Sequence, residues 1–197
     1  MAVDPSNLIQ TILAEGKTRM KNTKIEARLV AEIVVFSALS ALLYALRPFT
    51  LPFGGSITLG SMIPVFWLSL RRGAKVGIFS GAIFGAAALL IDVWYGVSVI
   101  SNPPQLLLDY PIAFGSLGLA GFFQKRPAIG VGIGSVCRFI AHFISGILFF
   151  WMYASYWGLD PITYSLAYNG SFMLPEFIVS AIIIYLLYKK GILNIYL

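Results

Sequence analysis

Residues 74–95 read AKVGIFSGAIFGAAALLIDVWY, and this run decides the class of fold. Its charged residues are Lys75 and Asp92, and each lies near one end of the run. A helix needs about 20 predominantly apolar residues to cross the hydrocarbon core of a bilayer. The run is long and apolar enough for one crossing, so it indicates an integral membrane protein.

The composition of the whole chain supports this assignment. Of the 197 residues, 58% are hydrophobic and 11% are charged, and the mean hydropathy is +0.84. A soluble domain typically carries about a quarter charged residues. Connections that contain Gly or Pro separate further apolar runs, which predict a compact all-α bundle of six transmembrane helices. The predicted spans are residues 29–46, 59–70, 74–95, 106–123, 129–152 and 171–189.

The first 26 residues differ from the rest because they are polar and basic. Apolar residues recur at helical spacing between Leu8 and Leu13, which indicates a short amphipathic helix on the membrane surface or a disordered tail. No apolar stretch with a small-residue cleavage site precedes the basic cluster, so a signal peptide is not expected. The predicted division is a cytoplasmic segment at 1–26 and a six-helix transmembrane domain at 27–197.

Basic residues predict the orientation. With six crossings, both termini and the second and fourth connections share one side, which holds twelve of the fourteen Lys and Arg residues. The positive-inside rule places that side in the cytoplasm. The chain is therefore predicted to be a multi-pass protein of the cell (plasma) membrane with both termini cytoplasmic. Its pI of 9.5 reflects topology and contacts with the lipid bilayer, so no nucleic-acid partner is predicted.

The opposite side is acidic and aromatic. Asp92, Asp109 and Asp160 fall at or beyond the outer ends of predicted spans, and Trp and Tyr are more frequent there than on the inner side. A belt of rings at headgroup depth explains many of them. The excess on one side also suits a cage that stacks on a cationic aromatic ligand.

The fifth predicted span carries Arg138, His142 and Gly146 at positions i, i+4 and i+8, on one helical face. A charged residue within the membrane usually faces the bundle interior. Arg138 is predicted to lie near the cytoplasmic end, where a structural ion pair or a side chain that reaches the headgroups is favoured. His142 fits a hydrogen-bonded core residue and a ligand contact equally well. Gly146 would allow a planar ligand or another helix to approach.

Two further segments carry polar residues beside aromatic ones. Asp109 and Tyr110 open the fourth span, where an acid stabilises a helix start or contacts a ligand. Tyr164 and Asn169 precede the predicted sixth span. Asn169 is interpreted as a helix N-cap or as a hydrogen-bonding group for a ligand amine.

The motifs of familiar ATPases and membrane hydrolases are missing from the chain. The sequence contains no G-x-x-x-x-G-K-[ST], H-E-x-x-H or G-x-S-x-G motif. A single His and a single Cys, Cys137, cannot form a histidine metal cluster or an internal disulfide. The sequence therefore predicts no catalytic residue, no metal site and no cofactor.

Four stretches follow one another along the chain: SMIP at 61–64 with RRG at 71–73, LDYPIAF at 108–114, RFIAHFISG at 138–146 and YSLAYNGS at 164–171. In this order and at these spacings they resemble the thiamine-specific S component of energy-coupling factor (ECF) transporters. The similarity covers about residues 27–190. It implies a six-helix protein that captures thiamine outside the cell for ATP-driven uptake. The implied protein partners are a T component and two ATPase subunits.

The resemblance also implies a ligand site. The implied contacts are Asp109, Tyr110, His142, Gly146, Tyr164 and Asn169, a ring from helix 5 that is either Phe150 or, preferably, Trp151, and Ser56 beside Phe53 in the first loop. Asp109 stands where the family usually has Glu. The small-residue face that docks the T component corresponds to Ala38, Ala41 and Ala45.

Other classes of function remain open from the residues alone. The alternatives are an S component for another small vitamin or precursor, or a stand-alone secondary vitamin carrier. A carrier is expected to show internal repeats or broken helices, and neither is evident. A membrane enzyme would have to use His142 with a nearby acid.

Overall fold

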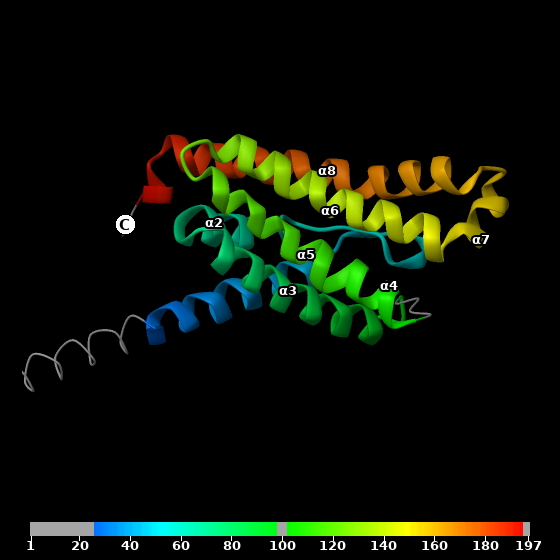
Figure 1. The fold of residues 1–197 in the computed structure, drawn as a ribbon, viewed down its shortest axis with the longest axis horizontal. Helices are drawn as coiled ribbons and strands as arrows, with labels where there is room; N and C mark the ends of the chain where they lie inside the picture. The colour runs from blue at the N-terminus through cyan, green and yellow to red at the C-terminus, as the bar shows by residue number, and fades with distance from the viewer. Residues whose placement is uncertain (1–25, 98–101, 195–197) are drawn as a thin grey trace, which may run out of the picture.

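The computed structural model describes residues 26–97 and 102–194, and helices make up most of both ranges (Figure 1). Within these two ranges, five helices are long and apolar enough to cross a membrane. They are Glu26–Ala45, Ala74–Trp94, Pro103–Phe123, Pro127–Phe149 and Pro161–Lys189. They correspond to five of the six predicted spans, so the all-α membrane architecture is confirmed. The predicted N-terminal segment lies outside the described residues, apart from Glu26.

The predicted second span is the exception. Its helix, α2 (Ile63–Arg72), has ten residues. It is therefore about 15 Å long at about 1.5 Å per residue, or half of a hydrocarbon core of about 30 Å. The prediction of a helix over 59–70 is wrong in extent because Gly60 has a φ of 86°, outside the helical region. The chain before it instead forms a small hairpin of β1 (Phe49–Thr50) and β2 (Ser56–Ile57).

The last helix, α8 (Pro161–Lys189), begins ten residues before the predicted start at 171. Asp160 is its N-cap and accepts hydrogen bonds from the backbone N–H groups of Ile162 and Thr163. Hydrogen bonds from the side chain and backbone of Thr163 lower the pKa of the Asp160 carboxyl. Asn169 consequently lies inside α8, and its interpretation as an N-cap is wrong.

The fourth crossing is a helix of changing pitch. It runs through α4 (Pro103–Leu107), the π-helical turn η2 (Leu108–Ile112), α5 (Ala113–Gly115) and the 3-10 segment η3 (Ser116–Phe123). Pro111 lies within η2 and has no backbone N–H to donate, which favours a local change of hydrogen-bonding pattern. π turns are frequent at functional sites, and this one carries Asp109 and Tyr110.

Helix α3 (Ala74–Trp94) packs closely against the fourth crossing through glycines that recur every fourth residue, among them Gly81 and Gly85. A Cβ atom at Gly81 would lie 2.3 Å from the carbonyl oxygen of Phe114, and one at Gly85 would lie 2.5 Å from that of Tyr110. Only glycine allows this approach. This close contact fixes the backbone that presents Tyr110 and Phe114.

The long helices lie along the long axis of the molecule, so the molecule has two ends at which the helices start and stop (Figure 1). The start of the Glu26–Ala45 helix, the α2–α3 junction and the end of α8 lie at one end. Helix α4, the short helix α7 (Trp151–Ala154) and the tip of the hairpin lie at the other.

The Glu26–Ala45 helix packs on the bundle with one face only. Its buried face includes Ser37, whose Oγ lies 2.8 Å from Oγ of Ser80 in α3. Of the predicted docking residues, Ala38 is exposed, whereas Ala41 and Ala45 are half-buried at the edge of the contact.

Candidate functional site

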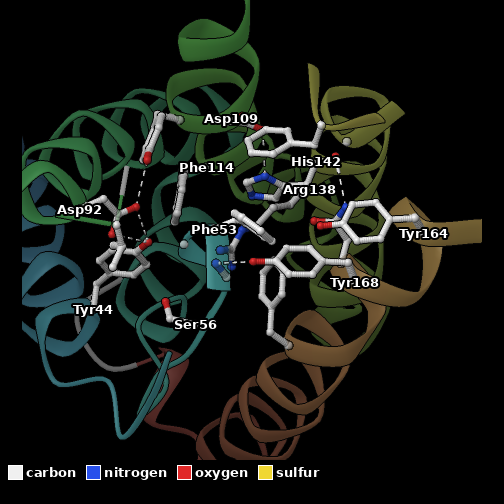
Figure 2. Close-up of a pocket in the computed structure, with 18 residues that line it drawn as sticks. Tyr44, Phe53, Ser56, Asp92, Asp109, Phe114, Arg138, His142, Tyr164 and Tyr168 are labelled. Atoms are coloured by element: carbon white, nitrogen blue, oxygen red, sulfur yellow. Dashed lines mark hydrogen bonds and ion pairs between the residues drawn. The ribbon is translucent and has the colours of Figure 1, made fainter. Parts of the chain in front are cut away.

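A cavity of about 740 Å³, including the part open to the surroundings, lies between the hairpin, α3, η2, α6 (Pro127–Phe149) and α8. Much of its wall is aromatic: Tyr44, Phe53, Tyr110, Phe114, Phe150, Tyr164, Tyr168 and Phe172. The polar side chains of the lining are Ser56, Asp92, Asp109, Arg138, His142 and Asn169. Figure 2 shows Asp92 and Tyr44 on one side, with Tyr164 and Tyr168 on the other.

The structure brings most of the predicted site residues together in this cavity. The lining includes Ser56, Asp109, Tyr110, His142, Gly146, Phe150, Tyr164 and Asn169. Trp151 is not part of it, and 56% of this residue is exposed. Helix α6 ends before Phe150, where ψ is 9°, and α7 begins at Trp151. Phe150 therefore lines the cavity in this structure and Trp151 does not, while the preference for Trp151 as the ring that stacks on a ligand stays a prediction.

Several lining residues were not predicted from the sequence. Tyr168 and Phe172 follow Tyr164 at i+4 and i+8 on α8, so helical spacing would have found them if the start of α8 had been known. Tyr44 lies on the Glu26–Ala45 helix and Asp92 lies on α3. No pattern in the sequence shows that these two helices meet at the cavity, so both residues become lining residues only through the packing of the helices.

Asp109 and His142 form the first polar contact of the site. Nδ1 of His142 lies 3.3 Å from Oδ1 of Asp109, and both side chains are 14% exposed. The π turn carries Asp109, and α6 carries His142. Nε2 of His142 is buried without a hydrogen-bond partner among the described residues. The partner of Asp109 is thus a histidine, which carries a positive charge only when both of its ring nitrogens are protonated.

The carboxylate of Asp92 accepts hydrogen bonds from three side chains of the protein. They come from Nη1 of Arg47 at 2.7 Å, from the Tyr44 hydroxyl at 3.0 Å and from the Tyr110 hydroxyl at 2.9 Å. The charges of Asp92 and Arg47 cancel in a buried pair. The cluster also holds the hydroxyl of Tyr110, so it shapes the cavity wall and contributes no net charge.

A second buried ion pair joins α6 to α8. Nη1 of Arg138 lies 3.0 Å from Oε2 of Glu176. The other oxygen of Glu176 accepts hydrogen bonds from the backbone N–H of Thr58, at 2.9 Å, and from the Thr58 hydroxyl. The predicted structural ion pair of Arg138 is confirmed. The alternative, a side chain that reaches the cytoplasmic headgroups, is wrong because Arg138 is 3% exposed and lines the cavity.

Tyr168 holds the hairpin beside the cavity through two hydrogen bonds. Its hydroxyl accepts a hydrogen bond from the backbone N–H of Gly55 at 2.9 Å and donates one to the carbonyl oxygen of Pro52. Phe53, at the tip, has a φ of 67°, and its ring centroid lies 4.0 Å from that of Tyr153. The hairpin and Tyr168 of α8 together close one side of the cavity.

Gly146 and Asn169 mark the contact of α6 with α8. A Cβ atom at Gly146 would lie 2.1 Å from Oγ of Ser165, so this glycine allows the close approach of another helix. The amide nitrogen of Asn169 donates to the carbonyl oxygens of Ser165 at 2.9 Å and of His142 at 3.3 Å. These bonds orient the carboxamide and leave its oxygen to accept a hydrogen bond from a ligand.

The charges around the cavity leave one carboxylate without an arginine. Asp92 pairs with Arg47, and Glu176 pairs with Arg138. With a neutral His142, Asp109 remains as the uncompensated negative charge. Among the described residues no group of three or more His, Cys, Asp or Glu side chains is arranged to hold a metal ion. The arrangement suits the binding of an aromatic cation.

Comparisons with known proteins give a consistent result. The family described as Thiamine transporter protein (Thia_YuaJ) matches residues 30–194. A curated protein from Bacillus subtilis, thiamine transporter ThiT, is 35% identical over 190 residues, which cover 87% of this chain and 95% of that protein. Another ThiT, from Lacticaseibacillus paracasei, is 32% identical over 139 residues, covering 62% and 68%. The solved structure of ThiT from Listeria monocytogenes has a TM-score of 0.71 at 27% identity, and covers 84% of this chain and 96% of that one.

Proposed function

Because this chain belongs to the Thiamine transporter protein family (Thia_YuaJ), we propose that it binds thiamine from outside the cell and delivers it to an ECF-type importer. In this role it is the S component, the membrane subunit that recognises the vitamin. It acts by binding and transport and catalyses no reaction.

The observation that carries the proposal is the carboxylate of Asp109, which lies in an aromatic cavity and has no arginine partner among the described residues. Thiamine has a permanently cationic thiazolium ring joined to an aminopyrimidine. Asp109 supplies an opposite charge, and the two arginine-paired acids add none. A cation that leaves water for this cavity therefore gains a charge partner that the protein does not already neutralise.

The cavity walls suit the two rings of thiamine. Tyr164 and Tyr168 stack on each other with centroids 5.7 Å apart, and Phe150 lies on the same lining. Aromatic faces attract cations, with about 2 kcal/mol or more per contact when it is desolvated. The carboxamide oxygen of Asn169 is placed to accept a hydrogen bond from the exocyclic amine of the pyrimidine. These groups supply stacking and orientation, while Asp109 supplies charge.

The topology proposed for this function has six crossings. Helix α2 and the chain from the hairpin together run from the cavity end towards the opposite end (Figure 1), so they complete a sixth passage that α2 alone is too short to make. The bias of basic residues then places both termini in the cytoplasm and the cavity near the outer surface.

Uptake would require further subunits, because the chain has no phosphate-binding motif for ATP. A T component and two ATPase subunits are the proposed partners. The exposed apolar face of the Glu26–Ala45 helix, with Ala38 on it and Ala41 and Ala45 at its edge, is the proposed docking surface.

Calorimetric titration of the purified protein tests the proposal. We expect affinity to fall in the order thiamine, riboflavin, biotin at one fixed salt concentration. Riboflavin is flat and neutral, so it gains stacking without ion pairing, and biotin is anionic. Tighter binding of riboflavin or biotin would instead indicate an S component for another vitamin. Binding that depends on a coupling ion would favour a secondary carrier.

A further inference from the structure

Arg138 is the one cationic side chain, apart from a protonated His142, among the described residues that line the cavity. Its guanidinium carbon lies 4.3 Å from the centroid of the Phe114 ring, which is also part of the lining. An arginine is unexpected on the wall of a site for a cation. Two like charges within about 8 Å of each other at an effective dielectric constant near 20 lower affinity by about tenfold or more.

Glu176 lies behind this arginine and outside the lining. The residue is 1% exposed, and its carboxylate contacts Arg138 through one oxygen and Thr58 through the other. Both oxygens are thus engaged by described residues, and Glu176 itself is not part of the cavity lining. Glu176 has the position of a counter-charge that a ligand does not touch.

We propose that Glu176 determines the selectivity of the cavity for a cation, because it cancels the charge of Arg138 on the cavity wall. The inference rests on the proposed function and adds to it a residue that acts through another. Asp109 attracts the ligand, and Glu176 removes the repulsion that would oppose it. Glu176 therefore acts through Arg138, whose charge it balances, and it makes no contact with the vitamin.

The same ion pair also holds α6, α8 and the chain after β2 together, so loss of affinity alone would not separate charge from structure. A structural role changes the affinity of every ligand that fills the cavity. A charge role changes the affinity of a cation more than that of a neutral ligand of the same shape. The informative quantity is therefore the ratio of two dissociation constants.

The experiment measures binding of thiamine and of its uncharged analogue, in which a thiophene ring replaces the thiazolium, to the purified full chain. In Glu176→Gln we expect thiamine affinity to fall by about tenfold more than analogue affinity. The double variant Arg138→Gln/Glu176→Gln should return the ratio towards that of the unaltered protein. Glu32→Gln is the matched control, because Glu32 pairs with Arg72 at the opposite end of the molecule, so the ratio should not move.

The outcomes separate the two proposals. If the unaltered protein does not bind thiamine, the proposed function fails, whatever the variants do. If it binds and Glu176→Gln changes both affinities by the same factor, the role of Glu176 in selectivity is overturned. Should Glu176→Gln fail to fold, Arg138→Gln takes its place. This variant leaves Glu176 unpaired and must shift the ratio in favour of thiamine, and an unchanged ratio there overturns the inference.

Discussion

The carboxylate of Asp109 and the imidazole of His142 meet at 3.3 Å, although 33 residues separate them along the chain. The contact joins a π turn on the fourth crossing to α6, and both groups line the cavity. A carboxylate that contacts a histidine, with no arginine beside it among the described residues, retains its attraction for a cationic ligand. This relationship distinguishes Asp109 from Asp92 and Glu176.

Replacement of Asp109 by Asn is expected to weaken thiamine binding by about 2–5 kcal/mol, because a desolvated cation loses its charge partner. Asp160→Asn is the matched control. Asp160 is an acid at the same end of the molecule, but it caps α8 and is not part of the cavity lining. Calorimetric titration of both variants checks the prediction, and equal affinities for the unaltered protein and Asp109→Asn would contradict it.

The rings at positions 150 and 151 should behave differently. Phe150 lines the cavity, whereas Trp151 is largely exposed outside it. Phe150→Ala is expected to cost about 0.5–1.5 kcal/mol of thiamine binding from lost ring contact, and Trp151→Ala should cost much less. The same titration measures both. A larger loss in Trp151→Ala would show that the sequence-based preference for Trp151 describes the ligand-bound protein better.

The proposed topology predicts which end of the protein faces outward. Tyr156 is 81% exposed beside the cavity end, and Lys125 is exposed at the opposite end. In a Cys137→Ser background, Tyr156→Cys should react with an impermeant maleimide on intact cells, and Lys125→Cys should react only after permeabilisation. The reverse pattern would invert the topology and with it the direction of capture.

The glycine contact between α3 and the fourth crossing should be sensitive to a single methyl group. Gly81→Ala places a Cβ atom 2.3 Å from the carbonyl oxygen of Phe114, so the backbone must shift. We expect a loss of about 1–3 kcal/mol in stability, measured as a lower unfolding temperature in detergent. Gly132→Ala on α6 is the control, because nothing lies within 4 Å of its added Cβ atom. Equal unfolding temperatures would show that the helices can separate at no cost.

Hydropathy determined the membrane class of this protein, because about 20 consecutive apolar residues have few alternatives to a membrane crossing. Five predicted spans match described helices for that reason. Helix boundaries were less predictable. Asp160 and Pro161 are a recognisable N-cap and first-turn pair, yet the apolar signal of α8 becomes continuous only after residue 171, so its first ten residues were missed.

Local patterns and the family resemblance indicated part of the cavity. The i, i+4, i+8 spacing of Arg138, His142 and Gly146 places them on one face of a helix. The resemblance added Ser56 and Phe150, whereas Tyr44, Asp92, Tyr168 and Phe172 were not predicted. A pattern of this kind shows which residues share a face. It does not show what that face meets. The role of Arg138 therefore stayed open between an ion pair and the headgroups, and that of Gly146 between a ligand and another helix.

Only the tertiary structure decided which charges cancel. Arg47 and Asp92 are far apart in sequence, as are Arg138 and Glu176, and each pair forms because the packing of the helices brings its members within 3.0 Å. The energy of an ion pair depends on distance and burial, and neither follows from composition. The sequence shows an acidic outer half, whereas the packing of the helices leaves Asp109, among the described acids that line the cavity, as the carboxylate that no arginine neutralises.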